Sequence, residues 1–516
     1  MGFLGVSRKC SPEPTIESDT IIGVIDTGVW PESESFNDKG FGPPPKKWEG
    51  ACKGGKNFTC NNKVIGARYY NSKAPKVDSA RDDDGHGSHC ASIAAGNYVK
   101  GASFYGIAEG TARWGPSARI AAYKVCNSDG CNSADILAAF DDAIADGVDI
   151  ITISVGGDYP VKLENDAVAI GSFIRKSVNA FSLNGTSFPL VKLFGEQFSE
   201  GKIVLCRLID GVDEAFRAGA LGSVSALESY IPDLPLSDVS YVVPVAASSL
   251  QTKDFPLVES YFRSTKSPKV DIMKSESVKN LDAPRVAGFS SKGPNNIIPD
   301  ILKACTQLIT PDITAPGIEI LAAYSPEATP SDNNNDPRMV NYNILSEHQC
   351  RVHMLRCNCL SWIMDSRKDP LAEFAYGAGQ IDPVKAVDPG LVYETFTEDY
   401  IKLLCSLGYD STKLKQIFGV NTTCPAGPQT TPKDLNYPSM TRPEKSTYKV
   451  TTSTSPEYNI TVTPNVLTFG ATNEKKSFDV IISGKINNGK MVSASLEWSD
   501  GVHKVRSPIV VYPDNF

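Results

Sequence analysis

The feature that most constrains the fold is a short apolar run that ends in a carboxylate. Residues 21–25 read Ile-Ile-Gly-Val-Ile, and Asp26 follows directly, ahead of a Thr-Gly pair. A short continuous apolar run bounded by a turn signal is typical of a strand that is buried on both faces. Asp26 would then stand at the carboxyl end of a parallel strand, where α/β sheets place their sites. Taken alone, however, Asp26 is better explained as an ordinary turn residue.

Apolar runs alternate with stretches of helical spacing up to about residue 173, and this alternation predicts a parallel sheet with helices on both faces. Residues 118–125 and 148–155 form two further apolar runs. Between them, residues 133–146 carry apolar side chains at helical spacing, with Ser133 as the expected N-cap and Gly147 as the stop. Strand–helix–strand order indicates parallel strands with helices on both faces, and therefore an α/β fold.

Two further regions differ from this pattern. From about residue 175 to 275 we expect a separate small α/β insert, with strands at 201–206 and 242–247 and a helix at 212–220. From about residue 434 the chain is rich in Thr, Ser and Val with alternating apolar positions, as at 458–462 and 478–482. This alternation predicts a β-sandwich.

Length and composition exclude several classes of protein. A chain of 516 residues predicts two to four domains, and 41% hydrophobic with 21% charged residues is typical of globular proteins. A net charge of -8 disfavours nucleic acid as the main partner, because phosphate binding needs a basic face. We expect no transmembrane helix, because no run of 18 apolar residues occurs, and the first residues show no signal peptide.

Cysteines and asparagines nevertheless favour the secretory route. Three close cysteine pairs across polar loops suit disulfides, and they are Cys52 with Cys60, Cys126 with Cys131, and Cys405 with Cys424. A zinc site would call for Cys-x-x-Cys or clustered His, which these pairs lack. Asn-x-Ser/Thr acceptors for glycosylation stand at Asn57, Asn184, Asn421 and Asn459, although such tripeptides also arise by chance.

A second chemical signal accompanies Asp26. His86 lies between Gly85 and Gly87 and is followed by a run of small residues. Glycines let a substrate backbone approach, and small residues let a helix lie close against a sheet. His86 could instead be a structural or capping residue. Together with Asp26, it supplies the carboxylate and imidazole that orient and activate a serine nucleophile in the chain order Asp, His, Ser.

On these motifs the chain resembles the plant subtilisin-like serine proteases of the cucumisin-like type. Residues 24–33 match the aspartate block, and residues 84–89 match the histidine block with Ser88 in place of the usual Thr. Further landmarks of the family follow in order at 154–157, 290–294, 311–317, 376–379 and 389–393.

The resemblance implies a subtilisin-like parallel sheet with helices on both faces, a protease-associated insert and a fibronectin-III-like β-sandwich. The expected boundaries are 1–173 and 281–430 for the two parts of the catalytic domain, 174–280 for the insert and 431–516 for the sandwich.

The resemblance also assigns roles to single residues. Asp26 would orient the imidazole, and His86 would act as general base and then general acid. Ser154, Gly156 and Gly157 would pair with the substrate backbone. The implied partners are polypeptide substrates and a propeptide outside this chain, with no nucleic acid or membrane. The implied location is extracellular, and the chemistry needs no metal or organic cofactor.

The chain departs from the family at the nucleophile. Where the family continues Asn-Ile-Leu-Ser with Gly-Thr-Ser-Met-Ser-Cys-Pro-His-Val-Ala, residues 347–356 read Glu-His-Gln-Cys-Arg-Val-His-Met-Leu-Arg. Codons that encode the family's segment encode this decapeptide when they are read one base out of frame. A metal site at Cys350, His353, Cys357 and Cys359 is a weaker explanation of the same residues. Ser346 precedes the lost motif and is not its nucleophile.

A second departure follows residue 173. The family's Ala-Gly-Asn-Ser-Gly block, which carries the oxyanion asparagine, is missing there, and with it we expect the loss of a core strand. Two hypotheses result. The chain is by family a serine endopeptidase that retains Asp26 and His86, and as written it is expected to be inactive. Alternatively, it is a non-catalytic product of a mis-spliced or decayed gene, at most a peptide- or protein-binding remnant.

Overall fold

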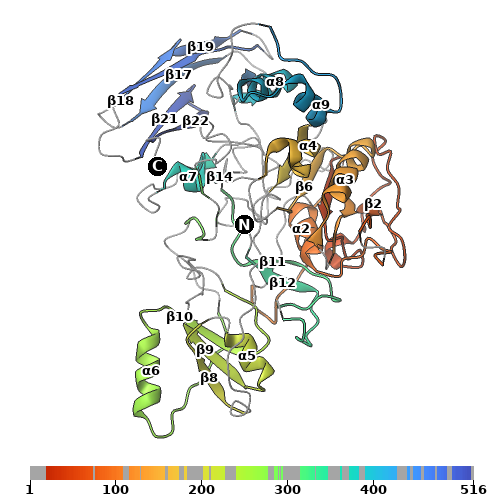
Figure 1. Cartoon of the computed structure of the whole chain (residues 1–516), viewed down its shortest axis with the longest axis vertical. Helices are drawn as coiled ribbons and strands as arrows, with labels where there is room; N and C mark the ends of the chain where they lie inside the picture. Colours follow the sequence, from red (N-terminus) through yellow and green to blue (C-terminus); the bar gives the residue numbers. More distant parts are fainter. Residues whose placement is uncertain are drawn as a thin grey trace.

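The computed structural model describes residues 19–73, 76–108, 116–127, 130–156, 161–173, 179–182, 201–208, 211–226, 240–276, 284–288, 290, 292–293, 314–331, 333–346, 361–362, 371–382, 390–394, 396–426, 439–441, 446–454, 458–470, 474–484 and 491–512. Its centre is a five-stranded sheet in the order β2-β3-β1-β6-β7 (Figure 1). All neighbouring strands in this sheet run parallel. The bounds are β1 Ile21–Asp26, β2 Val64–Tyr69, β3 Arg119–Lys124, β6 Ile150–Ile153 and β7 Asn179–Ser182.

Helices cover both faces of this sheet, as the sequence predicts. One face of β1 presents Ile22 and Val24 to a core that includes alanines of α2 (His86–Ala95). The opposite face presents Ile21 and Ile25 to a core shared with α3 (Ser133–Ala145) and α4 (Ala167–Phe173). Because side chains alternate along a strand, every residue of β1 is buried by one layer or the other.

The expected start of the helix near residue 133 needs a local correction. The helix expected at 133–146 is α3, but its N-cap is Asn132, whose side-chain oxygen accepts a hydrogen bond of 2.9 Å from the Ala134 amide. Ser133 is instead the first helical residue. The chain leaves the helix through Gly147, whose φ of 85° lies in the left-handed region.

The expectation that the sheet loses a strand after residue 173 is not met. Strand β7 follows α4 and pairs in parallel with β6, with Ile150 opposite Asn179 and Ile153 opposite Ser182. The parallel sheet therefore has a fifth strand at the position where the family's block is missing from the sequence.

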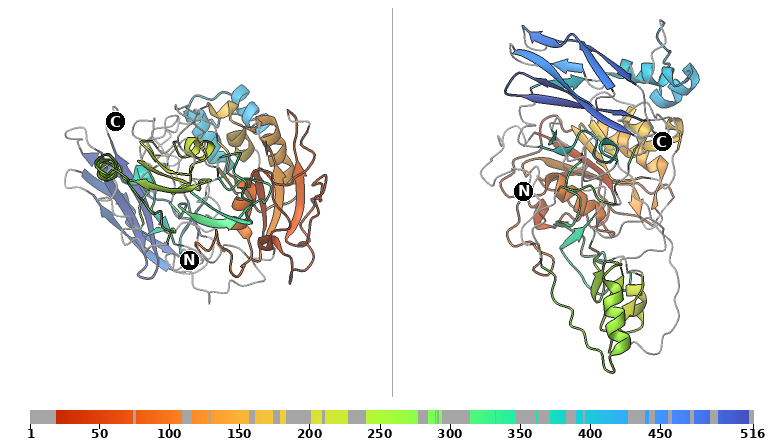
Figure 2. Two further views of the ribbon diagram at one scale, coloured as in Figure 1. Left: turned by 90° about the horizontal axis from the view of Figure 1, so that it is seen from below. Right: turned by 90° about the vertical axis from the view of Figure 1, so that its left-hand side faces the viewer.

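The insert contains a parallel three-stranded sheet of its own, in the order β10-β9-β8 (Figure 1). Figure 2 shows the same elements, in yellow-green to green, from two further sides. The strands are β8 Ile203–Cys206, β9 Gly222–Ala226 and β10 Ala246–Leu250, and the helices are α5 Gly211–Arg217 and α6 Phe255–Ser264. The strand expected at 242–247 begins only at Ala246. Pro244 explains the shift, because proline has no N–H to donate to a sheet.

The chain then returns to the main domain. Strands β11 Ile320–Ala323 and β12 Tyr342–Leu345 form an antiparallel pair beside α2. Helices α8 Thr397–Ser406 and α9 Ser411–Phe418 pack on the outside of α4, where Leu404 and Ile417 contact a cluster that includes Ala169. The shorter elements are η2 Glu34–Phe36, β4 Cys126–Asn127, β5 Gly130–Cys131, η3 Leu163–Asn165, β13 Ser361–Trp362, α7 Glu373–Tyr376, β14 Gln380–Ile381, β15 Val392–Glu394 and β16 Ser439–Thr441.

The C-terminal part is a β-sandwich, as predicted. Its sheets have the orders β19-β17-β21-β22 and β18-β20. The strands are β17 Ser446–Ser453, β18 Tyr458–Thr463, β19 Val466–Phe469, β20 Asp479–Gly484, β21 Val492–Ser499 and β22 Lys504–Val511. Buried positions alternate strictly along β18, and the core includes Tyr448, Phe469 and Trp498.

A polar and an aromatic contact join the sandwich to the main domain. Arg506 of β22 donates to Glu373 of α7 at 3.1 Å, and Glu373 is only 1% exposed. Beside this ion pair, the rings of Phe374 and Tyr512 meet edge to face at 5.2 Å.

Candidate active site

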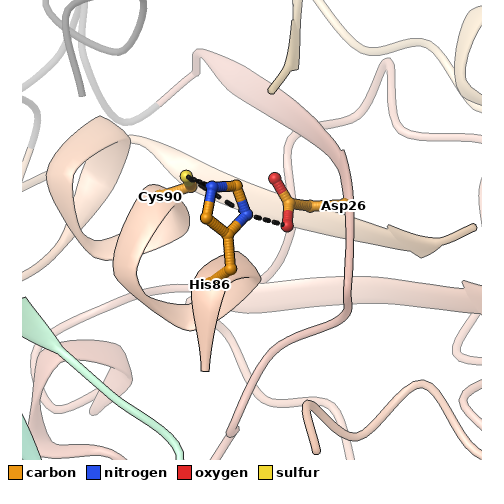
Figure 3. Close-up of side chains that lie close together, drawn as sticks. All are labelled: Asp26, His86 and Cys90. Atoms are coloured by element: carbon orange, nitrogen blue, oxygen red, sulfur yellow. Dashed lines mark hydrogen bonds and ion pairs between the residues drawn. The ribbon is translucent and has the colours of Figure 1, made fainter. Parts of the chain in front are cut away.

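Asp26 and His86 lie side by side at the carboxyl edge of the central sheet. Asp26 is the last residue of β1 and shares the parity of Ile22 and Val24, so its side chain faces α2. His86 is the first residue of α2. The His86 Nδ1 and Asp26 Oδ1 atoms are 2.6 Å apart (Figure 3). The sheet edge and the helix start thus bring together the two residues that the sequence singles out.

This contact selects the tautomer of a neutral imidazole. The Thr27 amide also donates to Asp26 Oδ1, at 2.7 Å. An ionised carboxylate can only accept, so the bond to Asp26 places the ring hydrogen on Nδ1 and leaves the lone pair on Nε2. Asp26 is 2% exposed, whereas the His86 side chain is 17% exposed. The pair can therefore orient an imidazole whose outer nitrogen takes and returns a proton.

Asp82 holds the turn that carries His86. Its buried carboxylate accepts hydrogen bonds from the Gly85 amide at 2.8 Å, the Ser88 amide at 2.8 Å and the Thr27 hydroxyl at 2.9 Å. Thr27 follows Asp26 directly, so one carboxylate links the end of β1 to the first turn of α2. Asp82 is not among the site residues predicted from the sequence. Its signal is an Asp three residues before the glycine that precedes the helix, a spacing that suits side-chain bonds to backbone amides.

Gly85 and Gly87 stand where a side chain would collide with other parts of the protein. A Cβ on Gly87 would lie 2.1 Å from the Gly28 carbonyl oxygen, and a Cβ on Gly85 would lie 2.2 Å from the Tyr324 ring. Gly85 also has a φ of 97°, in the left-handed region. Gly87 thus allows α2 to pack closely on the end of β1, and Gly85 allows the Tyr324 ring to approach. The approach of a substrate backbone to these glycines stays a prediction.

The residues expected to pair with substrate follow the neighbouring strand. Ser154 comes directly after β6 and is 4% exposed, and Gly156 is half-buried. Gly157 lies outside the described residues. The Cys90 thiol of α2 contacts the Ser154 hydroxyl at 3.7 Å, so this segment lies against the helix of His86.

The other sequence-predicted sites lie away from this pair. The structure contains disulfides between Cys52 and Cys60, between Cys126 and Cys131, and between Cys405 and Cys424. The side chains of Asn57, Asn421 and Asn459 are exposed, and Asn184 lies outside the described residues.

Ser346, which stands directly before the altered segment, forms a hydrogen bond to the backbone. Ser346 Oγ accepts a hydrogen bond of 2.8 Å from the Glu319 amide. Residues 347–360 and 363–370 lie outside the described residues, and so does the metal-site alternative at Cys350, His353, Cys357 and Cys359. Within the described part of the chain, no helix has the length and apolarity needed to cross a membrane.

Comparisons with known proteins show which family and which domains the chain resembles. The subtilase family model matches residues 17–196, and a fibronectin type-III domain model matches residues 439–511. Subtilisin-like protease SBT4.3 of Arabidopsis thaliana is 44% identical over 631 residues, which cover 99% of this chain and 84% of that protein. Subtilisin-like protease SBT4.4 of the same plant is 40% identical over 634 residues, with 99% and 84% covered. A crystal structure of a lanthipeptide protease covers 72% of this chain and 87% of its own, at 14% identity and a TM-score of 0.29.

The chain has a subtilisin-like fold with a C-terminal fibronectin type III domain. The chain belongs to the subtilase family, as a plant subtilase of the cucumisin type.

Proposed function

We propose that this chain is a subtilase that assembles its aspartate–histidine pair but has no serine for that pair to activate. It belongs to a family of serine endopeptidases that act on polypeptides, and as written it does not hydrolyse them. The observation that carries this proposal is the reading of residues 347–356, which replaces the family's Gly-Thr-Ser-Met segment directly after Ser346.

The contacts of Ser346 support the proposal. A nucleophile must lie within hydrogen-bond reach of the imidazole that activates it. The Ser346 hydroxyl instead accepts from the Glu319 amide, at the end of the β11–β12 pair. Ser346 is therefore a turn residue in this proposal.

The length of the alignments also supports it. The match to SBT4.3 extends over 631 residues although this chain has 516. Well over a hundred positions of that alignment therefore face gaps in this chain. Such gaps fit the loss of whole blocks, including the family's oxyanion block, which is missing after residue 173 of this chain. Removal of a single oxyanion donor already lowers kcat by about 10²–10³-fold in a subtilase.

A second candidate function is peptide binding without hydrolysis. The segment that begins at Ser154 lies against α2 beside His86, through the contact of Cys90 with the Ser154 hydroxyl. In this candidate, Ser154, Gly156 and Gly157 pair with the backbone of an extended peptide. Extracellular location fits either function, because three disulfides and exposed acceptors at Asn57, Asn421 and Asn459 suit an oxidising, glycosylating route.

The test is hydrolysis of a fluorogenic polypeptide by the secreted chain and by its His86→Ala variant, with an active plant subtilase as positive control. We expect both chains to give the same background rate. Hydrolysis that is abolished by His86→Ala would contradict the proposal, because it would show that the pair activates a nucleophile. Hydrolysis that survives His86→Ala comes from a contaminating protease.

A further inference from the structure

The strand β20 of the C-terminal sandwich is exposed along its whole length. It pairs with β18 on one side, and within the described part of the chain it pairs with no second strand. All six residues of β20 are exposed, whereas buried and exposed residues alternate along β18. The sandwich lies at the opposite end of the molecule from the insert (Figure 1). Because every residue of β20 is exposed, its free edge is open to another molecule.

Two apolar side chains on the inner face of β20 lack the cover that their neighbours on β18 have. Val480 lies opposite Val462, and Ile482 lies opposite Ile460. The two β18 residues are each 7% exposed and belong to the sandwich core, whereas Val480 is 37% and Ile482 is 44% exposed. Directly opposite residues of an antiparallel pair share a face, so the core ends between β18 and β20. Removal of this apolar surface from water would be favourable.

β20 also lacks the features that protect an edge strand. Edge strands commonly carry lysine, proline or a bulge, which prevent pairing with another chain. β20 reads Asp-Val-Ile-Ile-Ser-Gly, and its one charged residue, Asp479, stands at its start. Its pairing with β18 continues over all six residues without a bulge. The three central apolar residues are β-branched, which favours an extended strand. This edge is therefore suited to pairing with a further strand.

The order of residues along β20 indicates which strand fits. Polar Asp479 and Ser483 flank three apolar residues, so the polarity pattern is the same in both directions about Ile481. An antiparallel pair of two β20 strands centred on Ile481 places Val480 opposite Ile482 of the second copy, on the inner face. The two Ile481 side chains lie opposite each other on the outer face. Asp479 lies opposite Ser483 of the second copy, so no like charges meet.

We propose that two copies of this chain associate through their β20 strands, in an antiparallel pair centred on Ile481. The two small sheets then form one four-stranded sheet about a twofold axis, the commonest symmetry of protein dimers. The pair satisfies backbone groups at both edges, and the inner-face residues Val480 and Ile482 of the two copies cover each other. Since one strand edge is a small interface, we expect association in the micromolar range rather than a permanent dimer.

This inference does not depend on the proposed function. It uses only the exposed edge of the sandwich and no residue of the aspartate–histidine pair. An active or an inactive chain would therefore associate in the same way.

The first test is disulfide cross-linking of the full-length chain through Ile481→Cys. Directly opposite residues have Cβ atoms about 4.5–5.5 Å apart, close to the separation that a disulfide spans. We expect mild oxidation to give a covalent dimer, with the introduced thiols joined to each other in the peptide map. Val502→Cys is the matched control, because Val502 is an exposed apolar residue between β21 and β22. Equal cross-linking of the two variants would overturn the proposal.

The second test measures the association of the unmodified chain by analytical ultracentrifugation over a range of concentrations. We expect a monomer–dimer equilibrium that Ile481→Lys weakens by about tenfold or more, because the substitution places two like charges opposite each other. Ile481 is exposed on the outer face, so this substitution leaves the core intact. Val502→Lys, the control, should leave the equilibrium unchanged.

Two results of the second test would overturn the proposal. One is a monomer at concentrations well above the micromolar range. The other is a dimer that Ile481→Lys leaves intact, which would place the interface between copies on another surface of the chain.

Discussion

His86 Nδ1 lies 2.6 Å from Asp26 Oδ1, although the two residues are 60 positions apart in the chain. Neither residue is held by this contact alone. The end of β1 and the start of α2 are joined by the Asp82 carboxylate and by glycines that allow the two backbones to touch. The geometry of the pair therefore depends on residues that take no part in proton transfer.

Replacement of Asp82 tests this support. Asp82→Ala leaves the Gly85 and Ser88 amides and the Thr27 hydroxyl without their acceptor in a buried site. We expect a loss of about 3 kcal/mol or more, because hydrogen bonds to a charged group contribute about 1.5–3 kcal/mol each and are not additive. Urea unfolding measures the loss. Asp78→Ala is the control, since the Asp78 side chain forms an exposed ion pair with Lys56. Equal midpoints for the two variants would refute the role of Asp82.

Close packing at Gly87 gives a second prediction. A methyl group there would meet the Gly28 carbonyl oxygen at 2.1 Å, so Gly87→Ala must push α2 away from β1. We expect destabilisation of about 1–3 kcal/mol, the usual cost of overpacking. Gly42→Ala is the matched control, because a Cβ at Gly42 meets no atom within 4 Å. Thermal melts of both variants check this, and a Gly87→Ala melt that coincides with that of Gly42→Ala would contradict the packing described here.

The ion pair between Arg506 of β22 and Glu373 of α7 gives a third prediction. Arg506→Met leaves the buried Glu373 carboxylate without its cation, which costs about 3–5 kcal/mol in buried pairs. Removal of both charges in Arg506→Met/Glu373→Leu should restore most of this loss. The double-mutant cycle is followed by unfolding midpoints, with Arg263→Ala as the control for an exposed pair. Strictly additive effects of the two substitutions would show that the charges do not interact.

The pH dependence of stability should contain a contribution from Asp166, which precedes α4. Burial raises the pKa of this carboxyl above 3.8, against the opposing hydrogen bonds from the Ala169 and Val168 amides. The folded chain therefore binds more protons than the unfolded chain between the two pKa values, and its stability falls as pH rises through the folded value.

Asp166→Asn keeps an acceptor oxygen for both amides and removes the charge. We expect the stability of this variant, relative to the unmodified chain, to increase as the pH is raised from about 4 to 7, above the reference carboxyl pKa of about 3.9. Urea midpoints at several pH values measure the difference. A difference that is constant with pH, or that shrinks as pH rises, would contradict the raised pKa.

Local signals explain what the sequence could predict. The strand from Ile21 is apolar at every position except Gly23 and Asp26, so both its burial and the exit of Asp26 at the sheet edge follow from the pattern. His86 is marked by its glycines. That the two residues meet was implied by the resemblance to the subtilases, which pair the aspartate block with the histidine block.

Features that depend on contacts between distant segments could not be predicted from the sequence. Asn132 rather than Ser133 caps α3, because two adjacent capping residues compete and only the path of the loop decides between them. Strand β7 fills a sheet position at which the missing block predicted the loss of a core strand. The position of Cys90 beside His86 could have been predicted, since Cys90 stands four residues after His86 and helical residues at that spacing share a face.

The most direct test of the central claim is labelling by a fluorophosphonate probe, which bonds covalently to an activated serine. The account predicts no labelling of the secreted chain under conditions that label an active plant subtilase stoichiometrically. Ser346→Ala and His86→Ala variants are treated in parallel. Stoichiometric labelling that survives Ser346→Ala but is lost in His86→Ala would contradict the account, because it would reveal a serine that the Asp26–His86 pair activates.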